Sequence, residues 1–137
     1  MELDPAGSGD LVVRKIEVLL AELNQPEQAG AFAETMIDGP YRDDTEMLVR
    51  ISSVMAGSID PGPAGRQAGV RAAERAVEIV GDEPNTVAAL ALAQFAAGDP
   101  ESAAKTMRRA ASLCDPGSPA YSTFQSYAEQ YESSGDE

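Results

Sequence analysis

The sequence predicts an all-α fold made of antiparallel helical hairpins. Apolar residues recur at spacings of three and four along most of the chain, which places them on one face of a helix. Proline and glycine interrupt these stretches, as in Gly39-Pro40, Pro61-Gly62-Pro63 and Gly98-Asp99-Pro100, and mark turns between short helices. No stretch alternates apolar and polar residues as a half-buried strand does. We therefore expect seven helices, in three hairpins and a terminal capping helix, and no sheet.

The first hairpin is expected over residues 10–38, after a flexible segment at 1–9. Asp10 has a side chain suited to cap a helix, and the apolar residues from 11 to 23 cover more than half of a helix circumference. Pro26 suits the first position of a second helix, which we expect to end near Ile37.

The second hairpin is expected over residues 44–80. Asp43 and Glu46 have the spacing of a capping box before its first helix, which we expect over about 44–58. A turn at 60–63 leads to a long helix over about 63–80. The residues that we expect this helix to bury are Gly69, Ala73, Ala76, Val77 and Val80.

The third hairpin is expected over residues 84–115, and a single helix over 118–132 follows before a flexible tail at 133–137. Ser118 and Pro119 suit the start of that last helix. Its apolar stripe would cover the exposed end of the preceding hairpin, as a cap does in a helical array. The residues of this stripe are Tyr121, Phe124, Ala128 and Tyr131.

Composition excludes several classes of function. The 137 residues suit one domain, and the net charge of −13 disfavours nucleic acid and anionic membranes as partners. With no histidine and a single cysteine, Cys114, the chain lacks the residues for a zinc site or a histidine-based triad. We therefore expect no cofactor, no metal and no catalysis. The absence of a long apolar run or a secretory signal, with one cysteine, predicts a cytoplasmic protein.

The second and third hairpins share an internal register. A shift of 34 residues superposes Gly69 on Ala103, Ala73 on Met107 and Ala76 on Ala110, so we expect small residues at helix crossings. The first hairpin follows with a shift of 40, the extra residues falling in the connector at 39–44. The order of Leu90-Ala91, Gly98-Asp99, Ala103, Met107, Ala110, Leu113 and Asp115-Pro116 resembles a tetratricopeptide repeat. Val87 stands where that family has a large aromatic residue.

The resemblance implies a right-handed superhelix whose concave surface, lined mainly by the first helix of each hairpin, binds peptides or proteins. The candidate groove residues are Arg14, Val18, Ile51, Val54, Asn85, Ala88, Leu92 and Phe95. The alternative is that they are ordinary core covered by the terminal helix. A carboxylate clamp is not expected, because Ala88 and Leu92 occupy places where that subgroup needs polar residues.

The same register aligns basic residues on the second helices, Arg71 with Lys105 and Arg75 with Arg109. We call these four residues the basic ridge. Such a row is either a solvated face or a docking site for an acidic partner.

These features predict a non-catalytic module that binds a protein or peptide. A second hypothesis makes the chain an accessory region of a larger enzyme system, because residues 71–132 also resemble the repeat tails that follow thioredoxin-like domains in some bacterial proteins. No Cys-x-x-Cys motif is present, so the redox activity itself would lie elsewhere. A third hypothesis is a homo-oligomer formed through the groove or the N-terminal end.

Overall fold

The computed structural model describes residues 5–57 and 62–135, and within these ranges all regular secondary structure is helical. The all-α prediction is therefore confirmed for this part of the chain. The elements are α1 (Pro5–Glu17), the π-helix η1 (Val18–Glu22), α2 (Pro26–Asp38), α3 (Thr45–Gly57), α4 (Gly62–Val80), α5 (Pro84–Ala96), α6 (Pro100–Ser112) and α7 (Pro119–Gly135). The expected turn residues Asp60 and Pro61, and parts of both expected flexible ends, lie outside the described residues.

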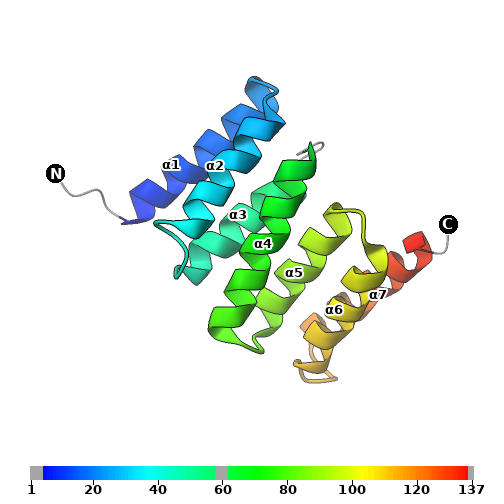
Figure 1. The fold of residues 1–137 in the computed structure, drawn as a ribbon. Helices are drawn as coiled ribbons and strands as arrows, with labels where there is room; N and C mark the ends of the chain where they lie inside the picture. Colours follow the sequence, from blue (N-terminus) through cyan, green and yellow to red (C-terminus); the bar gives the residue numbers. More distant parts are fainter. Residues whose placement is uncertain (1–4, 58–61, 136–137) are drawn as a thin grey trace.

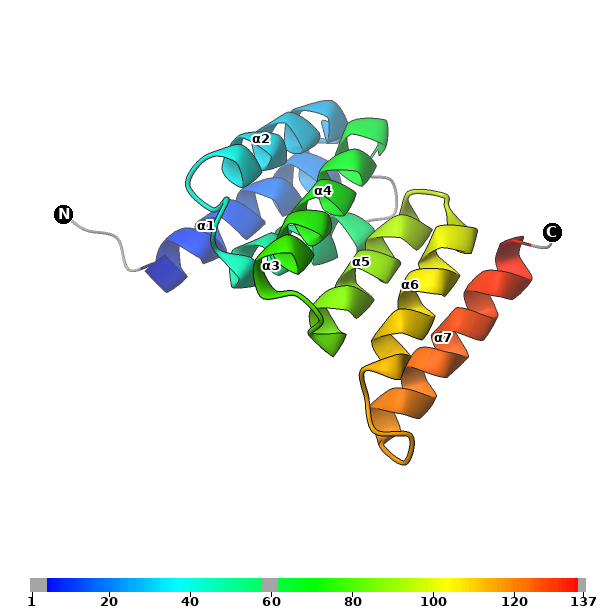
Figure 2. The same cartoon turned by 60° about the horizontal axis from the view of Figure 1, so that its bottom comes forward.

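The helical hairpins follow one another in a row, with the chain ends at opposite ends of it (Figure 1, Figure 2). Within this row α4 lies beside α2, and α3 lies behind α4 in the view of Figure 1. Helices α3 and α4 pack as one pair and α5 and α6 as another, and α7 packs along α6. Helix α5 also contacts both α3 and α4, so it joins the two pairs.

The first helix differs from the prediction at both ends. It begins at Pro5 and not after Asp10, which lies inside it. Proline is tolerated at a first helical position because the amide there has no partner within the helix. After Glu17 the chain continues as the π-helix η1, in which the Leu23 amide donates to the Val18 carbonyl at 2.9 Å.

Three carboxylates cap helices. The Met47 amide donates to Asp44 Oδ1 at 3.2 Å, so the residue that caps α3 is Asp44 and the expected capping box at Asp43 is wrong by one position. Glu83 and Asp99 accept hydrogen bonds from the amides of the third residues after them, at 2.8 and 3.1 Å. These bonds satisfy amides that have no partner inside the helix. Hydrogen bonds from the side chains of Thr86 and Ser102, together with the amide bonds, lower the pKa of the Glu83 and Asp99 carboxyl groups.

The core has two main parts joined at α4 and α5. One part lies between helices α1, α2, α3 and α4. It includes Ile16, Leu48, Ile51 and Met55, which are all fully buried. The other joins α5, α6 and α7, and a small cluster of α4 and α5 residues connects them. The small residues expected at crossings, Gly69, Ala73, Ala76, Ala103 and Ala110, are buried as predicted. Val77, also expected to be buried, is half-buried against the core. Val80 is 42% exposed, contrary to the prediction, because it is the last residue of α4 before the turn at Gly81.

The junctions between neighbouring hairpins are not alike. Helix α2 packs closely along α4, the second helix of the next hairpin, whereas α4 and α6 make no comparable contact. Gly30 permits the α2–α4 approach, because a Cβ there would lie 2.6 Å from Ala64 Cβ. The contact between α2 and α4 is therefore closer than the one between α4 and α6.

Candidate protein-binding surface

Helix α5 is surrounded by other helices on most of its sides. It contacts α3, α4 and α6, and its buried residues are Thr86, Val87, Ala88, Ala89, Leu90, Ala91 and Ala93. Two large apolar side chains nevertheless remain exposed, Leu92 at 43% and Phe95 at 38%. They are three residues apart, so they lie next to each other on one side of the helix.

Helix α7 extends this exposed apolar area with aromatic rings. The Phe95 ring stacks on Tyr131, with ring centroids 4.3 Å apart and planes inclined by 20°. Tyr131 is buried, and this burial raises the pKa of its hydroxyl. Tyr127 lies 6.2 Å from Tyr131 between centroids and is 39% exposed. We call Leu92, Phe95 and Tyr127 the α5–α7 surface.

Only part of the predicted groove coincides with this surface. Leu92 and Phe95 belong to it, and Asn85 is exposed near the start of α5. Ile51 and Ala88 are buried in the core and cannot line a groove, which corrects the prediction for both. The remaining candidates lie on other helices: Val54 is half-buried on α3, Val18 is half-buried in η1, and Arg14 on α1 pairs with Glu17 and Glu22.

Tyr127 was missed as a surface residue. The apolar stripe predicted for the last helix does not include it. Of that stripe, Ala128 and Tyr131 are buried, and Tyr121 and Phe124 are half-buried. Tyr127 does not belong to that stripe, and an aromatic residue off the buried face of a helix was the available signal.

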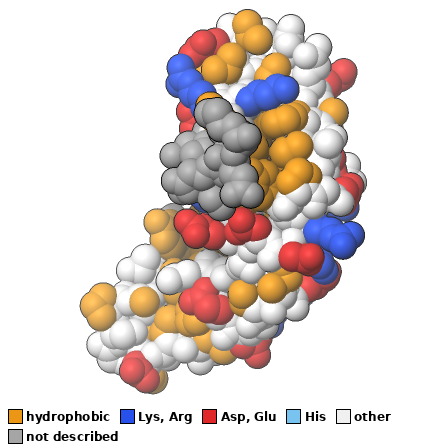
Figure 3. Space-filling model, turned by 90° about the vertical axis from the view of Figure 1, so that its left-hand side faces the viewer, with side chains coloured by type: hydrophobic (Ala, Val, Ile, Leu, Met, Phe, Trp, Pro, Cys, Tyr) orange, Lys and Arg blue, Asp and Glu red, His pale blue; other side chains and the backbone are white. Residues whose placement is uncertain are grey.

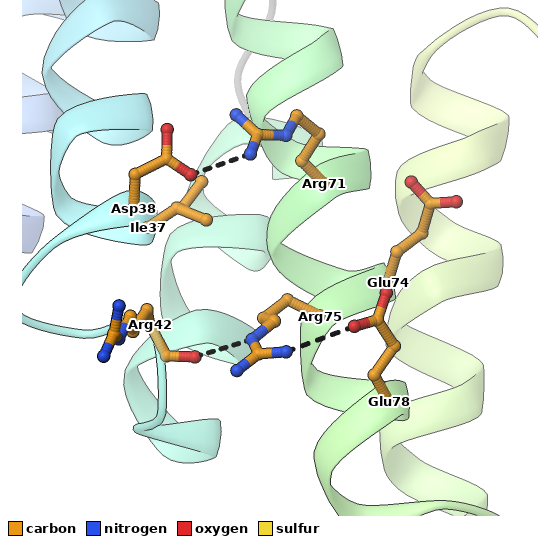
Figure 4. Close-up of a pocket in the computed structure, with 7 residues that line it drawn as sticks. All are labelled: Ile37, Asp38, Arg42, Arg71, Glu74, Arg75 and Glu78. Atoms are coloured by element: carbon orange, nitrogen blue, oxygen red, sulfur yellow. Dashed lines mark hydrogen bonds and ion pairs between the residues drawn. The ribbon is translucent and has the colours of Figure 1, made fainter.

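The basic ridge is paired with carboxylates of the chain itself. Arg71 on α4 forms ion pairs with Glu34 and Asp38 on α2, the latter at 2.8 Å. Arg75 pairs with Asp43 at 2.7 Å and Glu78 at 3.2 Å, and these carboxylates raise the pKa of its guanidinium group. Arg75 Nε also donates to the Arg42 carbonyl at 2.9 Å, as Figure 4 shows.

The third hairpin repeats this arrangement with different partners. Arg109 pairs with Asp82 in the turn before α5, and Lys105 lies 3.7 Å from Glu101 on its own helix. Arg108, which sequence reasoning overlooked, reaches α7 through Gln125 and Glu132. Arg108 and Arg109 thus connect neighbouring elements, whereas Lys105 pairs within α6. This geometry favours a solvated, internally paired ridge over a docking site.

A cleft of about 430 Å³ between α2 and α4 contains part of the ridge (Figure 4). Its charged lining consists of three arginines and three carboxylates, so it offers no excess of either charge to a ligand. Among the described residues, no three acidic, histidine or cysteine side chains are grouped to hold a metal ion. Within the same residues, no helix has the length and apolar character that crossing a membrane requires.

A second exposed apolar area lies at the end of the row formed by the first hairpin. Leu11 is 62% exposed and Leu23 54%, and the Lys15 ammonium lies 4.3 Å from the centroid of the Phe32 ring. Seen from this end, apolar side chains form a patch with basic side chains next to it (Figure 3).

Comparison with known proteins adds no relative: no protein-family model, no curated protein and no solved structure matches this chain.

Proposed function

We propose that this chain is a non-catalytic module that binds a protein or peptide partner through the α5–α7 surface. The supporting observation is the exposure of Leu92 and Phe95, two large apolar side chains, on a helix that buries residues 86–91 and Ala93 against its neighbours. Exposed side chains of this kind cost solubility, and grouped aromatic and aliphatic residues are typical of the centre of protein interfaces. The buried Tyr131 ring stacks on Phe95 and fixes its position, so the α5–α7 surface is preorganised for a partner.

We also infer that the hairpins form a tetratricopeptide-like superhelix. The 34-residue register and the packing of α5 against the preceding pair support this inference. We also propose a cytoplasmic location, which agrees with the lone cysteine.

The test compares partner capture by the wild-type chain and two double variants. L92S/Y127S removes two apolar side chains from the α5–α7 surface but keeps the Phe95–Tyr131 stack. The matched control, L11S/L23S, removes two even more exposed apolar side chains from the other end of the row. After capture and mass spectrometry, the affinity of each purified partner is measured by calorimetry.

We expect L92S/Y127S to weaken binding by about 30-fold or more, as loss of interface anchors does, and L11S/L23S to bind as the wild type. Circular dichroism melting curves verify that both variants are folded. Equal binding by L92S/Y127S and the wild type would refute the proposal. Sedimentation of the same variants tests self-association, which only L11S/L23S would abolish if the N-terminal end were a dimer interface.

A further inference from the structure

One side of the continuous helix formed by α1 and η1 lies on the surface of the first hairpin. The opposite side carries the fully buried Ile16 and packs toward the core. Four residues of the surface side follow one another at spacings of three and four, which places them on a single face of the helix. They are Leu11, Arg14, Val18 and Glu22, and all but the half-buried Val18 are exposed. We call these four residues the α1 stripe.

A contact within the chain shows that the α1 stripe stays on one face through the π-helix. Arg14 Nη2 donates to Glu22 Oε1 at 3.4 Å, although the two residues are eight positions apart. Both side chains are more than half exposed. An ion pair of this kind contributes little to stability, so each side chain can exchange its partner at small cost.

The order of side chains along the α1 stripe is self-complementary. From its N-terminal end the stripe is apolar at Leu11, basic at Arg14, apolar at Val18 and acidic at Glu22, and the exposed Leu23 follows. Arg14 and Glu22 are each four residues from Val18. If two copies pack antiparallel with their Val18 residues opposite each other, Arg14 of each copy therefore faces Glu22 of the other. Leu11 then comes within about 3 Å, along the helix axis, of Leu23 of the second copy.

Local charge makes this face suitable for a second copy of the chain. The whole chain has a net charge of −13, so two copies repel each other over most of their surface. Residues 11–23 contain two basic and two acidic residues, and their net charge is zero. Antiparallel packing brings the basic positions of one copy to the acidic position 22 of the other, whereas parallel packing would bring like charges together.

The size of the contact indicates a weak dimer. Together α1 and η1 have 18 residues, which is about 27 Å along the axis, and the face is about 10 Å wide. Apolar side chains on this end of the molecule extend the contact (Figure 3). It still falls short of the ~800 Å² per partner that stable interfaces bury, so we expect a dissociation constant of about 100 µM.

We propose that the chain forms a symmetric dimer in which the α1 stripes of two copies pack antiparallel about Val18. A contact of this symmetry closes with two copies and leaves the α7 ends free. The dimer would carry two α5–α7 surfaces, which strengthens binding to a partner with two matching sites. The α1 stripe lies apart from the α5–α7 surface, so the two proposals can fail or succeed separately.

The experiment is analytical ultracentrifugation of the full chain between about 5 and 500 µM, a range around the expected dissociation constant. R14E and E22R each replace attraction between the copies by repulsion, and each is expected to weaken the dimer at least tenfold. The exchange variant R14E/E22R is expected to dimerise as the wild type. An equimolar mixture of R14E and E22R is expected to form a heterodimer, because one chain is then acidic and the other basic at both positions.

Two controls change the net charge by the same amounts at exposed positions far from the α1 stripe. K105E on α6 matches R14E, and E129R on α7 matches E22R; both are expected to dimerise as the wild type. Circular dichroism melting curves verify that each variant is folded. A wild-type chain that stays monomeric at 500 µM, single variants that dimerise as the wild type, or a mixture that stays monomeric would each overturn the proposal.

Crosslinking tests the antiparallel orientation independently of charge. The background is C114S, which removes the one cysteine of the sequence, and the oxidant is diamide. V18C is expected to form a disulfide between two copies, because position 18 faces itself. L11C is not, because the two equivalent positions would lie about 21 Å apart along the axis, beyond the ~7 Å between Cα atoms that a disulfide spans. Equal crosslinking of both variants, or of neither, would contradict the antiparallel dimer.

Discussion

Replacement of Gly30 by alanine tests the α2–α4 junction most directly. The added Cβ would lie 2.6 Å from Ala64 Cβ, 2.7 Å from the Ala64 carbonyl carbon and 2.9 Å from the Gly65 nitrogen. Real Cβ atoms do not approach other atoms so closely, and two of these three are backbone atoms that cannot rotate away. The two helices must therefore move apart.

Two opposing effects set the size of the change. Alanine favours a helix over glycine by about 1 kcal/mol. Overpacking of a filled site typically costs about 1–3 kcal/mol, and contact with backbone puts Gly30 at the upper end of that range. We expect a net loss of about 2 kcal/mol in the free energy of unfolding, a large part of the total for a domain of this size.

Two other glycines provide graded controls. At Gly69 the nearest atom to the added Cβ would be Met55 Cβ at 3.0 Å, and at Gly57 no atom of the described residues lies within 4 Å. Urea denaturation followed by circular dichroism is expected to rank the variants G57A, G69A and G30A in order of decreasing stability. A G30A variant as stable as the wild type would refute the close packing of α2 on α4.

Two further predictions concern the third hairpin. Deletion of residues 118–137 is expected to cause aggregation or early melting, because Ala128 and Tyr131 complete the core around Met107; a monomeric truncation with unchanged melting temperature would contradict this. Because hydrogen bonds lower the pKa of Glu83 and Asp99 in the folded state, their stabilising effect is present above the unfolded pKa and disappears as the pH falls. Between about pH 5 and pH 3 the variant E83A/D99A is therefore expected to lose less stability than the wild type in urea titrations.

The helices and their buried faces could be predicted because local signals agreed with one another. Proline at the starts of α2, α5 and α6, and apolar spacing between the turns, fixed both the elements and most of the core. The start of α1 was less clear, because Pro5 and the glycines that follow resemble a loop in composition. Two adjacent aspartates could have capped α3: Asp44, directly before the helix, does so, whereas Asp43 pairs with Arg75, a contact between distant residues that a local pattern does not give.

The candidate site was harder to predict than the fold. A helical pattern gives the face on which a residue lies but not how completely its neighbours cover it, so Ile51 and Leu92 looked alike in the sequence. The structure buries the first and exposes the second.

The unequal hairpin junctions limit how this chain can be rearranged. An array of interchangeable units could be lengthened by copying any unit, but the first hairpin meets the second through Gly30, and the third hairpin has no equivalent contact with the second. A copy of the first hairpin inserted after the second would meet a surface of α3 and α4 that is shaped for α5. A copy of the third hairpin at that place would pack on this surface through its own α5. Growth of this protein by duplication, in evolution or by design, is therefore expected at its C-terminal side, between α6 and the closing helix α7.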